Sequence, residues 1–303
     1  MTALLLSIAT ILFFPGVIVR VKSRLSGRKG PGILQPWRNV LLLLRKGNVI
    51  STTTSFVFTV APLLYTATVL CAILLLPFPG IPSWFGFSGD FVFFAYLLAL
   101  GKFFFIISAM DTGSSFEGMG ANREAHYSML AEPAFFILFG TLALFTGHSS
   151  MQDIFPLLRF SHYSTAVIII IAVYLLIQIA MIENSRMPVD DPKTHLELTM
   201  IHEVMILDHS GFDLAIIHIG TNFKFAMYGI LVSNCLIPAS WTLLPKLGLF
   251  FAIQLGFSML TGILESFRAR KKLSKNPQFI LALSSIALVA FVIALLITFK
   301  QIA

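Results

Sequence analysis

The stretch between residues 183 and 211 concentrates ionisable side chains in an otherwise apolar chain. It holds six acids and three histidines: Glu183, Asp190, Asp191, Glu197, Glu203, Asp208, His195, His202 and His209. Histidine titrates near neutral pH, and burial can raise the pKa of a carboxyl group toward the same range. Carboxylates at a membrane boundary are costly and usually mark ion or proton routes. The stretch therefore predicts a proton relay, and a polar helix lying at the interface is the alternative.

Two prolines are expected to break the helical pattern inside this stretch, at Pro188 and Pro192. The pattern resumes at Lys193, and it places Glu197 and Asp208 near one face of the same helix. We therefore expect these two carboxylates to act together.

Two pairs in the same stretch share a helix face by their spacing. Glu183 and Arg186 are three residues apart and could form an ion pair. His195 and His202 invite a metal interpretation, but a clear third ligand is absent from the pattern. We expect no metal site in this chain.

Three more ionisable residues lie in or at the end of apolar runs. Glu132 directly precedes Pro133 and is expected about one and a half turns inside an apolar helix. Lys224 is in the middle of a run, where a lysine needs a partner or water. Glu265 lies at the end of the seventh apolar run. It either has a functional role or forms a structural ion pair with Arg268. We assign Glu132 and Lys224 to a proton path.

The segment between residues 101 and 133 adds further polar side chains. Asp111 ends a helix, and Arg123 stands beside Glu124. Lys102 is interpreted as lying at the start of a helix, so we expect its side chain to extend to the membrane interface.

The segment from Gly27 to Gly47 reads GRKGPGILQPWRNVLLLLRKG. Its glycines and prolines predict a turn, and LQPWRNVLLLLRK predicts an amphipathic helix lying at the interface. The segment is either a basic anchor or a docking platform for a soluble partner. The candidate docking residues of the chain are Arg28, Lys29, Gln35, Arg38, Asp111, Arg123 and Arg186.

The composition indicates a polytopic membrane protein, because 57% of the 303 residues are apolar and only 12% are charged. We predict an all-α integral membrane protein with eight transmembrane helices and interfacial amphipathic helices on the cytoplasmic side, forming one domain over residues 1–303. The apolar runs of spanning length cover residues 3–21, 56–78, 89–109, 127–146, 164–182, 212–236, 246–264 and 278–299.

The basic residues predict the orientation. They gather after the first and seventh apolar runs, and the alternate loops hold almost none. By the positive-inside rule both termini lie outside the cytoplasm. The formal charge of +7 therefore needs no nucleic-acid partner.

The two cysteines, Cys71 and Cys235, both fall inside apolar runs. A disulfide framework is not expected, and neither is a cysteine-ligated zinc or iron–sulfur site, which needs about four clustered ligands. Any electron transfer would use redox centres on partner subunits.

The chain resembles the family of subunit 1 of respiratory complex I, the NADH–quinone oxidoreductase H subunit, over nearly its whole length. FFFIISAMDTGSSFEGMGANREA (residues 103–125) and GRKGPGILQ look like the hydrogenase branch, which contains formate hydrogenlyase subunit 4 and the hydrogenase-4 membrane subunit. The other matching positions are Glu132, Pro133, Glu183, Arg186, Pro188, Asp190, Pro192, Glu197, Leu198, the DHSG of residues 208–211, and Lys224.

Two departures from the family pattern lie in the acid-rich stretch. Lys193 and His195 stand where the family usually has glutamates, and three extra residues separate Glu197 from Asp208. Fewer acidic residues therefore line the route that leads, in this family, from the quinone cavity into the membrane. This argues against a conventional ubiquinone site.

The resemblance implies a subunit that anchors a cytoplasmic redox arm and joins it to antiporter-like membrane subunits. Hydrogenase-like large and small subunits would carry the nickel–iron centre and the iron–sulfur clusters, in the inner (plasma) membrane of a bacterium or archaeon. Charge would move along Glu183, Glu197, Glu132 and Lys224. The alternatives are a quinone-binding subunit and a purely structural anchor. The full candidate proton path is Glu132, Glu183, Asp190, Glu197, His202, Glu203, Asp208, Lys224 and Glu265.

Overall fold

The computed structural model describes residues 2–158, 160, 163–190, 200–268 and 273–302. Eight helices in this part of the chain are long and apolar enough to cross a membrane. They are α1 (Thr2–Leu25), α3 (Phe56–Leu75), α4 (Asp90–Asp111), α5 (Ser115–Thr146), α7 (Tyr163–Glu183), α9 (Gly211–Leu236), α10 (Leu243–Phe267) and α11 (Asn276–Ile302). The predicted all-helical membrane fold is confirmed.

Shorter helices lie in the connections between the spans. They are α2 (Gln35–Leu44), α6 (Met151–Leu157), α8 (His202–Met205) and the 3-10 turn Leu273–Lys275. The amphipathic helix expected after Gly32 is α2, with Pro36 in its first turn, where a missing backbone N–H costs nothing. The sequence did not predict α6.

The helix α5 differs most from the predicted spans, because it begins at Ser115 and not near residue 127. Ser114 precedes it with an extended backbone, and the helix runs through Pro133 without ending there. Glu132 therefore lies near the middle of α5, far deeper than the one and a half turns expected from the sequence.

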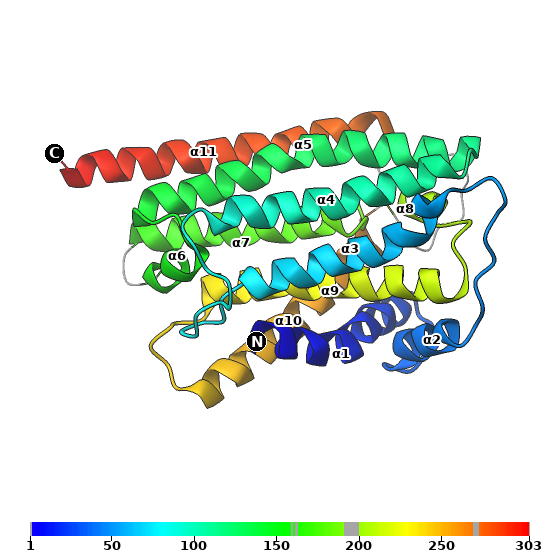
Figure 1. The fold of residues 1–303 in the computed structure, drawn as a ribbon. Coiled ribbons are helices and arrows are strands. Elements are labelled where there is room, and N and C mark those ends of the chain that lie inside the picture. The colour runs from blue at the N-terminus through cyan, green and yellow to red at the C-terminus, as the bar shows by residue number, and fades with distance from the viewer. Residues whose placement is uncertain (1, 159, 161–162, 191–199, 269–272, 303) are drawn as a thin grey trace.

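The eight spans form one helix bundle. Figure 1 shows α5 and α11 side by side at the top, α3 and α4 in the middle, and α1 and α10 below. The α9 helix contacts α1, α3, α7 and α10 and is the most enclosed of the spans, with 72% of its apolar window buried. Glycines at the helix crossings, such as Gly220 against Thr66 and Tyr65 of α3, let the backbones approach closely.

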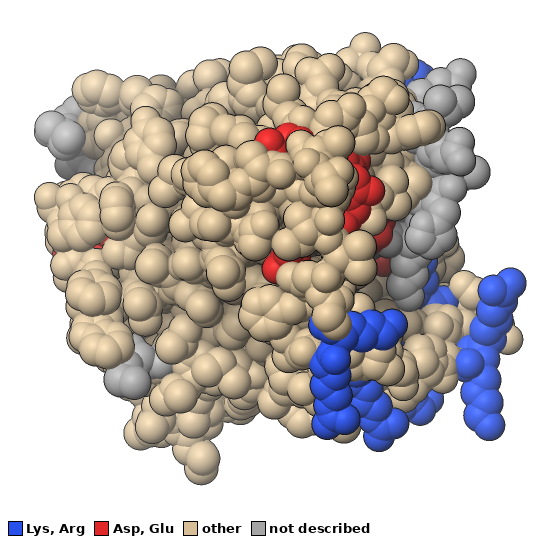
Figure 2. Space-filling model, turned by 45° about the vertical axis from the view of Figure 1, so that its right-hand side comes forward, with Lys and Arg blue, Asp and Glu red and all other residues tan. Residues whose placement is uncertain are grey.

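The two ends of the bundle differ in charge. One end carries α2 and exposed cations that include Arg24, Arg28, Lys29, Arg38, Arg45 and Lys46. We call it the basic end, and Figure 2 shows its lysines and arginines gathered on one side, with acidic side chains in a recess beside them. The other end, where α6 lies and α11 ends, is called the opposite end (Figure 1).

Candidate functional site

Four charged side chains from four spans form one buried chain of ion pairs. Lys102 of α4 places its Nζ atom 3.1 Å from Oε1 of Glu124 on α5 and 2.9 Å from Oε2 of Glu183 at the end of α7. Lys224 of α9 places its Nζ atom 2.7 Å from the same Glu183 oxygen. Lys102 and Lys224 are only 7% and 2% exposed. We call these four residues the charge cluster.

The charge cluster contains two cations and two anions. Because burial removes water from charged groups, such residues persist only where each is paired and hydrogen-bonded. Glu183 links the two cations, because its Oε2 atom accepts hydrogen bonds from both lysines. Protonating Glu183 would thus weaken the contacts of two cations at once.

Two members of the charge cluster were not assigned correctly from the sequence. Lys102 does not extend to the interface, so that expectation is wrong, and Glu124 was noted only as a neighbour of Arg123. The available signal was the position of Lys102, which lies 12 residues after Asp90 in a 22-residue helix. A lysine that far inside a span needs a partner.

His202 lies next to the charge cluster, at the start of the short helix α8. It lines a small cavity of about 10 Å³ together with Lys102, Glu124, Glu183 and Lys224. Its ring stacks on Phe105 with centroids 5.3 Å apart. Burial lowers the pKa of His202 to about 4, which makes the imidazole neutral at physiological pH.

A second ion-pair network surrounds Glu265 of α10. Its carboxylate accepts a hydrogen bond of 2.8 Å from Arg186 and lies 3.5 Å from Lys22 of α1. Arg186 therefore pairs with Glu265 and not with Glu183, and the alternative pairing of Glu265 with Arg268 is replaced by Arg186 and Lys22. The helix α7 ends at Glu183, so Arg186 leaves the helix face on which the pairing argument depended.

The acids around α8 lie at the basic end. Asp190 is buried and accepts the backbone N–H of His202 at 3.0 Å. Burial, reinforced by the charge of Asp190, raises the pKa of Glu203 to about 7. The described part of the helix expected from Lys193 to Asp208 is only α8, and Asp208 lies beyond its end. Glu197, with Asp191, Pro192, Lys193, His195 and Leu198, lies outside the described residues.

Three separate cavities that share lining residues lie along these groups, from the basic end into the bundle. A cavity of about 480 Å³ is lined by Glu203, Glu265 and His202, and His202 also lines the small cavity at the charge cluster. Lys102 and Glu183 then line a cavity of about 40 Å³ with Glu132. That volume accommodates water between polar groups.

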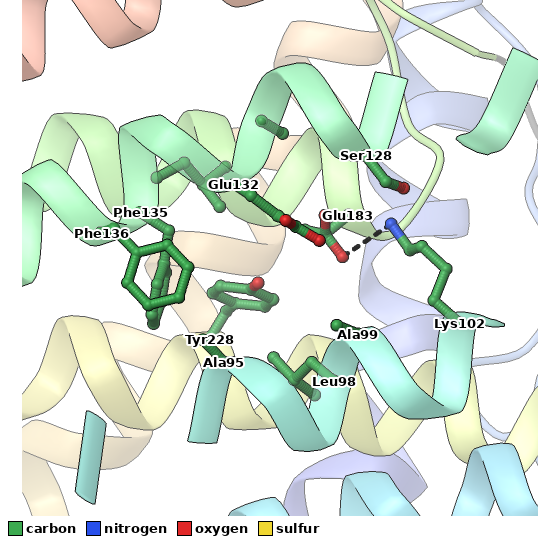
Figure 3. Close-up of a pocket in the computed structure, with 12 residues that line it drawn as sticks. Ala95, Leu98, Ala99, Lys102, Ser128, Glu132, Phe135, Phe136, Glu183 and Tyr228 are labelled. Carbon is green, nitrogen blue, oxygen red and sulfur yellow. Dashed lines mark ion pairs between the residues drawn. The ribbon is translucent and has the colours of Figure 1, made fainter. Parts of the chain in front are cut away.

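Glu132 ends this series on the flank of the bundle. Figure 3 shows its carboxyl group directed toward Glu183, with the Tyr228 ring below it. Glu132 also lines an open groove of about 440 Å³ with Tyr96 and Phe103. It is exposed there, and the described residues give it no ion-pair partner. Glu132 therefore faces both the inner cavity and the flank of the bundle.

Other candidate residues hold the basic end together. Asp111 accepts the backbone N–H and the hydroxyl of Ser55 at 2.7 and 2.9 Å, which ties the end of α4 to the start of α3. Arg123 donates to the Met200 carbonyl at 3.0 Å. Asp208 is exposed and donates its backbone N–H to Glu117 at 3.1 Å.

The remaining docking candidates lie on the surface. Arg28, Lys29 and Arg38 are exposed, and Gln35 donates to the Asn39 side chain at 2.9 Å. Nothing in the chain itself tests their docking, which stays a prediction. Within the described ranges, no group of three or more His, Cys, Asp or Glu residues is placed to hold a metal.

Comparison with known proteins identifies relatives of the whole chain. A family model described as NADH dehydrogenase matches residues 1–298. Hydrogenase-4 component C of Escherichia coli is 30% identical over 225 residues, which cover 74% of this chain and 70% of that protein. Formate hydrogenlyase subunit 4 of the same organism is 27% identical over 286 residues, covering 91% of this chain and 92% of the relative.

Two further proteins, more distant in sequence, also match this chain. NADH-ubiquinone oxidoreductase chain 1 of Cyanidium caldarium is 25% identical over 230 residues, which cover 74% of this chain and 64% of that protein. A chain of the membrane-bound sulfane sulfur reductase, an archaeal respiratory membrane complex, superimposes with a TM-score of 0.79 at 17% identity. The match covers 96% of this chain and 98% of the other, and it shows a common fold.

Proposed function

Because this chain belongs to the NADH dehydrogenase family, as a distant homologue of formate hydrogenlyase subunit 4 and hydrogenase-4 component C, we propose that it is the proton-conducting coupling subunit of a hydrogenase-like respiratory complex. It anchors a redox arm at its basic end and passes charge to antiporter-like membrane subunits. The nickel–iron centre and the iron–sulfur clusters belong to the partner subunits. The observation that carries the proposal is the series of cavities joined by ionisable residues.

The entry of the path is at the basic end. Glu203 lines the large cavity there, and its pKa of about 7 lets it gain and lose a proton near neutral pH. The partner arm docks over this end, where exposed Arg28, Lys29 and Arg38 offer a positively charged surface. A change of charge in the arm would then shift the protonation of Glu203.

The middle of the path is the charge cluster. When a proton reaches Glu183, the carboxyl group loses the charge that holds Lys102 and Lys224. Lys102 also lines the cavity that contains Glu132, and its long side chain can follow the charge to that carboxylate. Protonation of Glu183 and movement of the Lys102 ammonium group are thus coupled through their electrostatic interaction.

The exit of the path is lateral. Glu132 is exposed on the flank between α4 and α5, at mid-span, and a neighbouring membrane subunit must supply its polar contact there. This flank is where the antiporter-like subunits join the chain.

The proposal is tested with the whole complex reconstituted in sealed vesicles and driven by reduced methyl viologen. Proton movement is followed by a dye inside the vesicles, and electron transfer is measured in parallel. Glu132→Gln should reduce proton movement at least about tenfold, because a proton-carrying group is lost, while electron transfer in detergent continues. Met129→Leu, which lines the same groove as Glu132 but removes no group that can carry a proton, is the matched control. Unchanged proton movement in Glu132→Gln would refute the coupling role, and loss of assembly would favour the structural anchor.

The cavity of about 480 Å³ favours one second candidate, a quinone-binding subunit. Its lining combines apolar side chains such as Ile18 and Leu42 with the polar groups of His202 and Arg186, which fits an amphiphilic ring with a lipid tail. The chain would bind and orient the headgroup, and the quinone would accept the electrons. Organic extraction of the purified complex separates the candidates, because only a quinone site retains about one quinone per chain.

A further inference from the structure

Two hydroxyl groups face the cavity between Glu183 and Glu132, and neither has a part in the proposed path. One belongs to Ser128 of α5 and the other to Tyr228 of α9, and both side chains line the cavity of about 40 Å³. Figure 3 shows Ser128 on the side of Lys102 and Tyr228 below the two carboxyl groups. The hydroxyl groups thus lie on two sides of the space that a proton must cross between these carboxyl groups.

The spacing of residues along the two helices explains this placement. Ser128 precedes Glu132 by four residues in α5, and Tyr228 follows Lys224 by four residues in α9. Residues four apart lie on the same face of a helix, one turn from each other. Each hydroxyl group therefore comes from the same helix face as an ionisable residue of the proposed path.

Both hydroxyl groups are buried, and neither has a hydrogen-bond partner among the described residues. Ser128 is 9% exposed, and its Oγ atom is enclosed without a partner. Tyr228 is 1% exposed, and its hydroxyl group makes no hydrogen bond to a described residue. Buried hydroxyl groups ordinarily bind a protein group or ordered water. Because these two face a cavity, water is the partner that fits.

The two carboxyl groups on this cavity also lack a direct connection. Glu183 pairs with Lys102 and Lys224, whereas Glu132 has no ion pair and no hydrogen bond to a side chain within the described ranges. A proton that passes from one carboxyl group to the other therefore needs a carrier between them. The cavity of about 40 Å³ has room for it, because one water molecule requires roughly 10–15 Å³ and two to four polar partners.

We propose that Ser128 and Tyr228 hold ordered water in this cavity and act as positioning residues of the proton path, an inference that rests on the proposed function. The water accepts the proton of protonated Glu183 and releases one of its own to the carboxylate of Glu132. Tyr228 donates a hydrogen bond to the water, and the Oγ atom of Ser128 accepts one from it. Both hydroxyl groups keep their own protons, because they do not ionise near neutral pH. Glu183 then regains its negative charge and its contacts with both lysines.

The first experiment looks for the water itself, in a high-resolution electron cryo-microscopy map of the intact complex. Ordered water is expected about 2.7–3.0 Å from the Tyr228 hydroxyl and from the Oγ atom of Ser128, the distance of an O–H···O hydrogen bond. Tyr228→Phe should lose this water while its ring and the charge cluster keep their positions. A map that resolves water elsewhere in the bundle but none at these hydroxyl groups would overturn the proposal. So would a side chain of a neighbouring subunit bound to both.

The second experiment measures proton movement in the sealed vesicles used for Glu132→Gln. Tyr228→Phe and Ser128→Ala each remove one hydroxyl group and keep the rest of the side chain. Each should slow proton movement about tenfold, because the water between the carboxyl groups loses its orientation. Electron transfer measured in detergent corrects for the amount of assembled complex. Tyr174→Phe, the same change at an exposed tyrosine of α7, is the matched control and should leave the rate unchanged.

The thermal stability of the variants separates a positioning role from a packing role. Neither hydroxyl group has a partner in the described part of the chain, so its removal should leave the unfolding temperature unchanged or raise it. A lower unfolding temperature in both variants would assign the hydroxyl groups to packing and overturn the proposal. Normal proton movement in Tyr228→Phe and Ser128→Ala, with slow movement in Glu132→Gln, would overturn the water site alone. Normal movement in Glu132→Gln would instead refute the proposed function.

Discussion

The Nζ atom of Lys224 lies 2.7 Å from Oε2 of Glu183, and the two side chains are 2% and 12% exposed. The pair joins the middle of α9 to the last residue of α7, and Lys102 approaches the same oxygen from α4. Removing one member therefore affects three helices. The charge cluster is therefore both a candidate part of the proton path and a set of contacts that holds these helices together.

The first prediction concerns the stability of this joint. Glu183→Gln leaves two buried ammonium groups without their shared anion, and breaking a buried pair in this way costs about 3–5 kcal/mol. The thermal unfolding of the complex in detergent should shift to lower temperature. The double variant Glu183→Gln with Lys224→Met should recover part of the loss, because an unpaired cation is removed. A single variant as stable as the wild type would show that the pairs contribute nothing to the fold.

The second prediction is a pH dependence set by Glu203. Its pKa is raised from 4.5 to about 7 in the folded chain, so the folded state holds more protons than the unfolded state between these values. Stability should therefore fall as the pH rises from 4.5 to 7 and then level off, relative to Glu203→Gln. Chemical unfolding at several pH values measures this difference. Asp208→Asn is the control, and a difference between Glu203→Gln and the wild type that is independent of pH would contradict the assignment.

The third prediction concerns the crossing of α9 and α3. A methyl group at Gly220 would lie 2.6 Å from Oγ1 of Thr66 and 2.9 Å from the Tyr65 ring. It would also disturb the hydrogen bond of 3.0 Å from Thr66 to the Ile216 carbonyl. Overpacking of this kind costs about 1–3 kcal/mol, so Gly220→Ala should lower the thermal stability of the complex.

Gly140 of α5 provides the matched control for this crossing, because a methyl group there meets no atom within 4 Å. Gly140→Ala should leave the stability unchanged or raise it by up to about 1 kcal/mol, since alanine loses less backbone freedom in a helix than glycine. Equal effects of the two substitutions would mean that the close approach at Gly220 is not required.

The sequence by itself determined the eight spans, the amphipathic helix α2 and the family. The length of an apolar run and a local motif both depend only on residues that are consecutive in the chain. It also pointed to Glu132, Glu183 and Lys224 as ionisable groups of an apolar chain. What it could not determine was which charges meet. Spacing on one helix offered the pairs Glu183–Arg186 and Glu265–Arg268, and neither forms, because α7 ends at Glu183 and α10 ends at Phe267.

Only the tertiary structure decided the partners. Glu183 lies 81 residues from Lys102 and 41 residues from Lys224 along the chain, so their contacts depend on how α4, α7 and α9 cross. The same packing places Glu132 on an exposed flank and brings it into one cavity with Lys102 and Glu183. In a membrane span, the cost of an unpaired charge requires that a partner exist, and helix packing decides which residue it is.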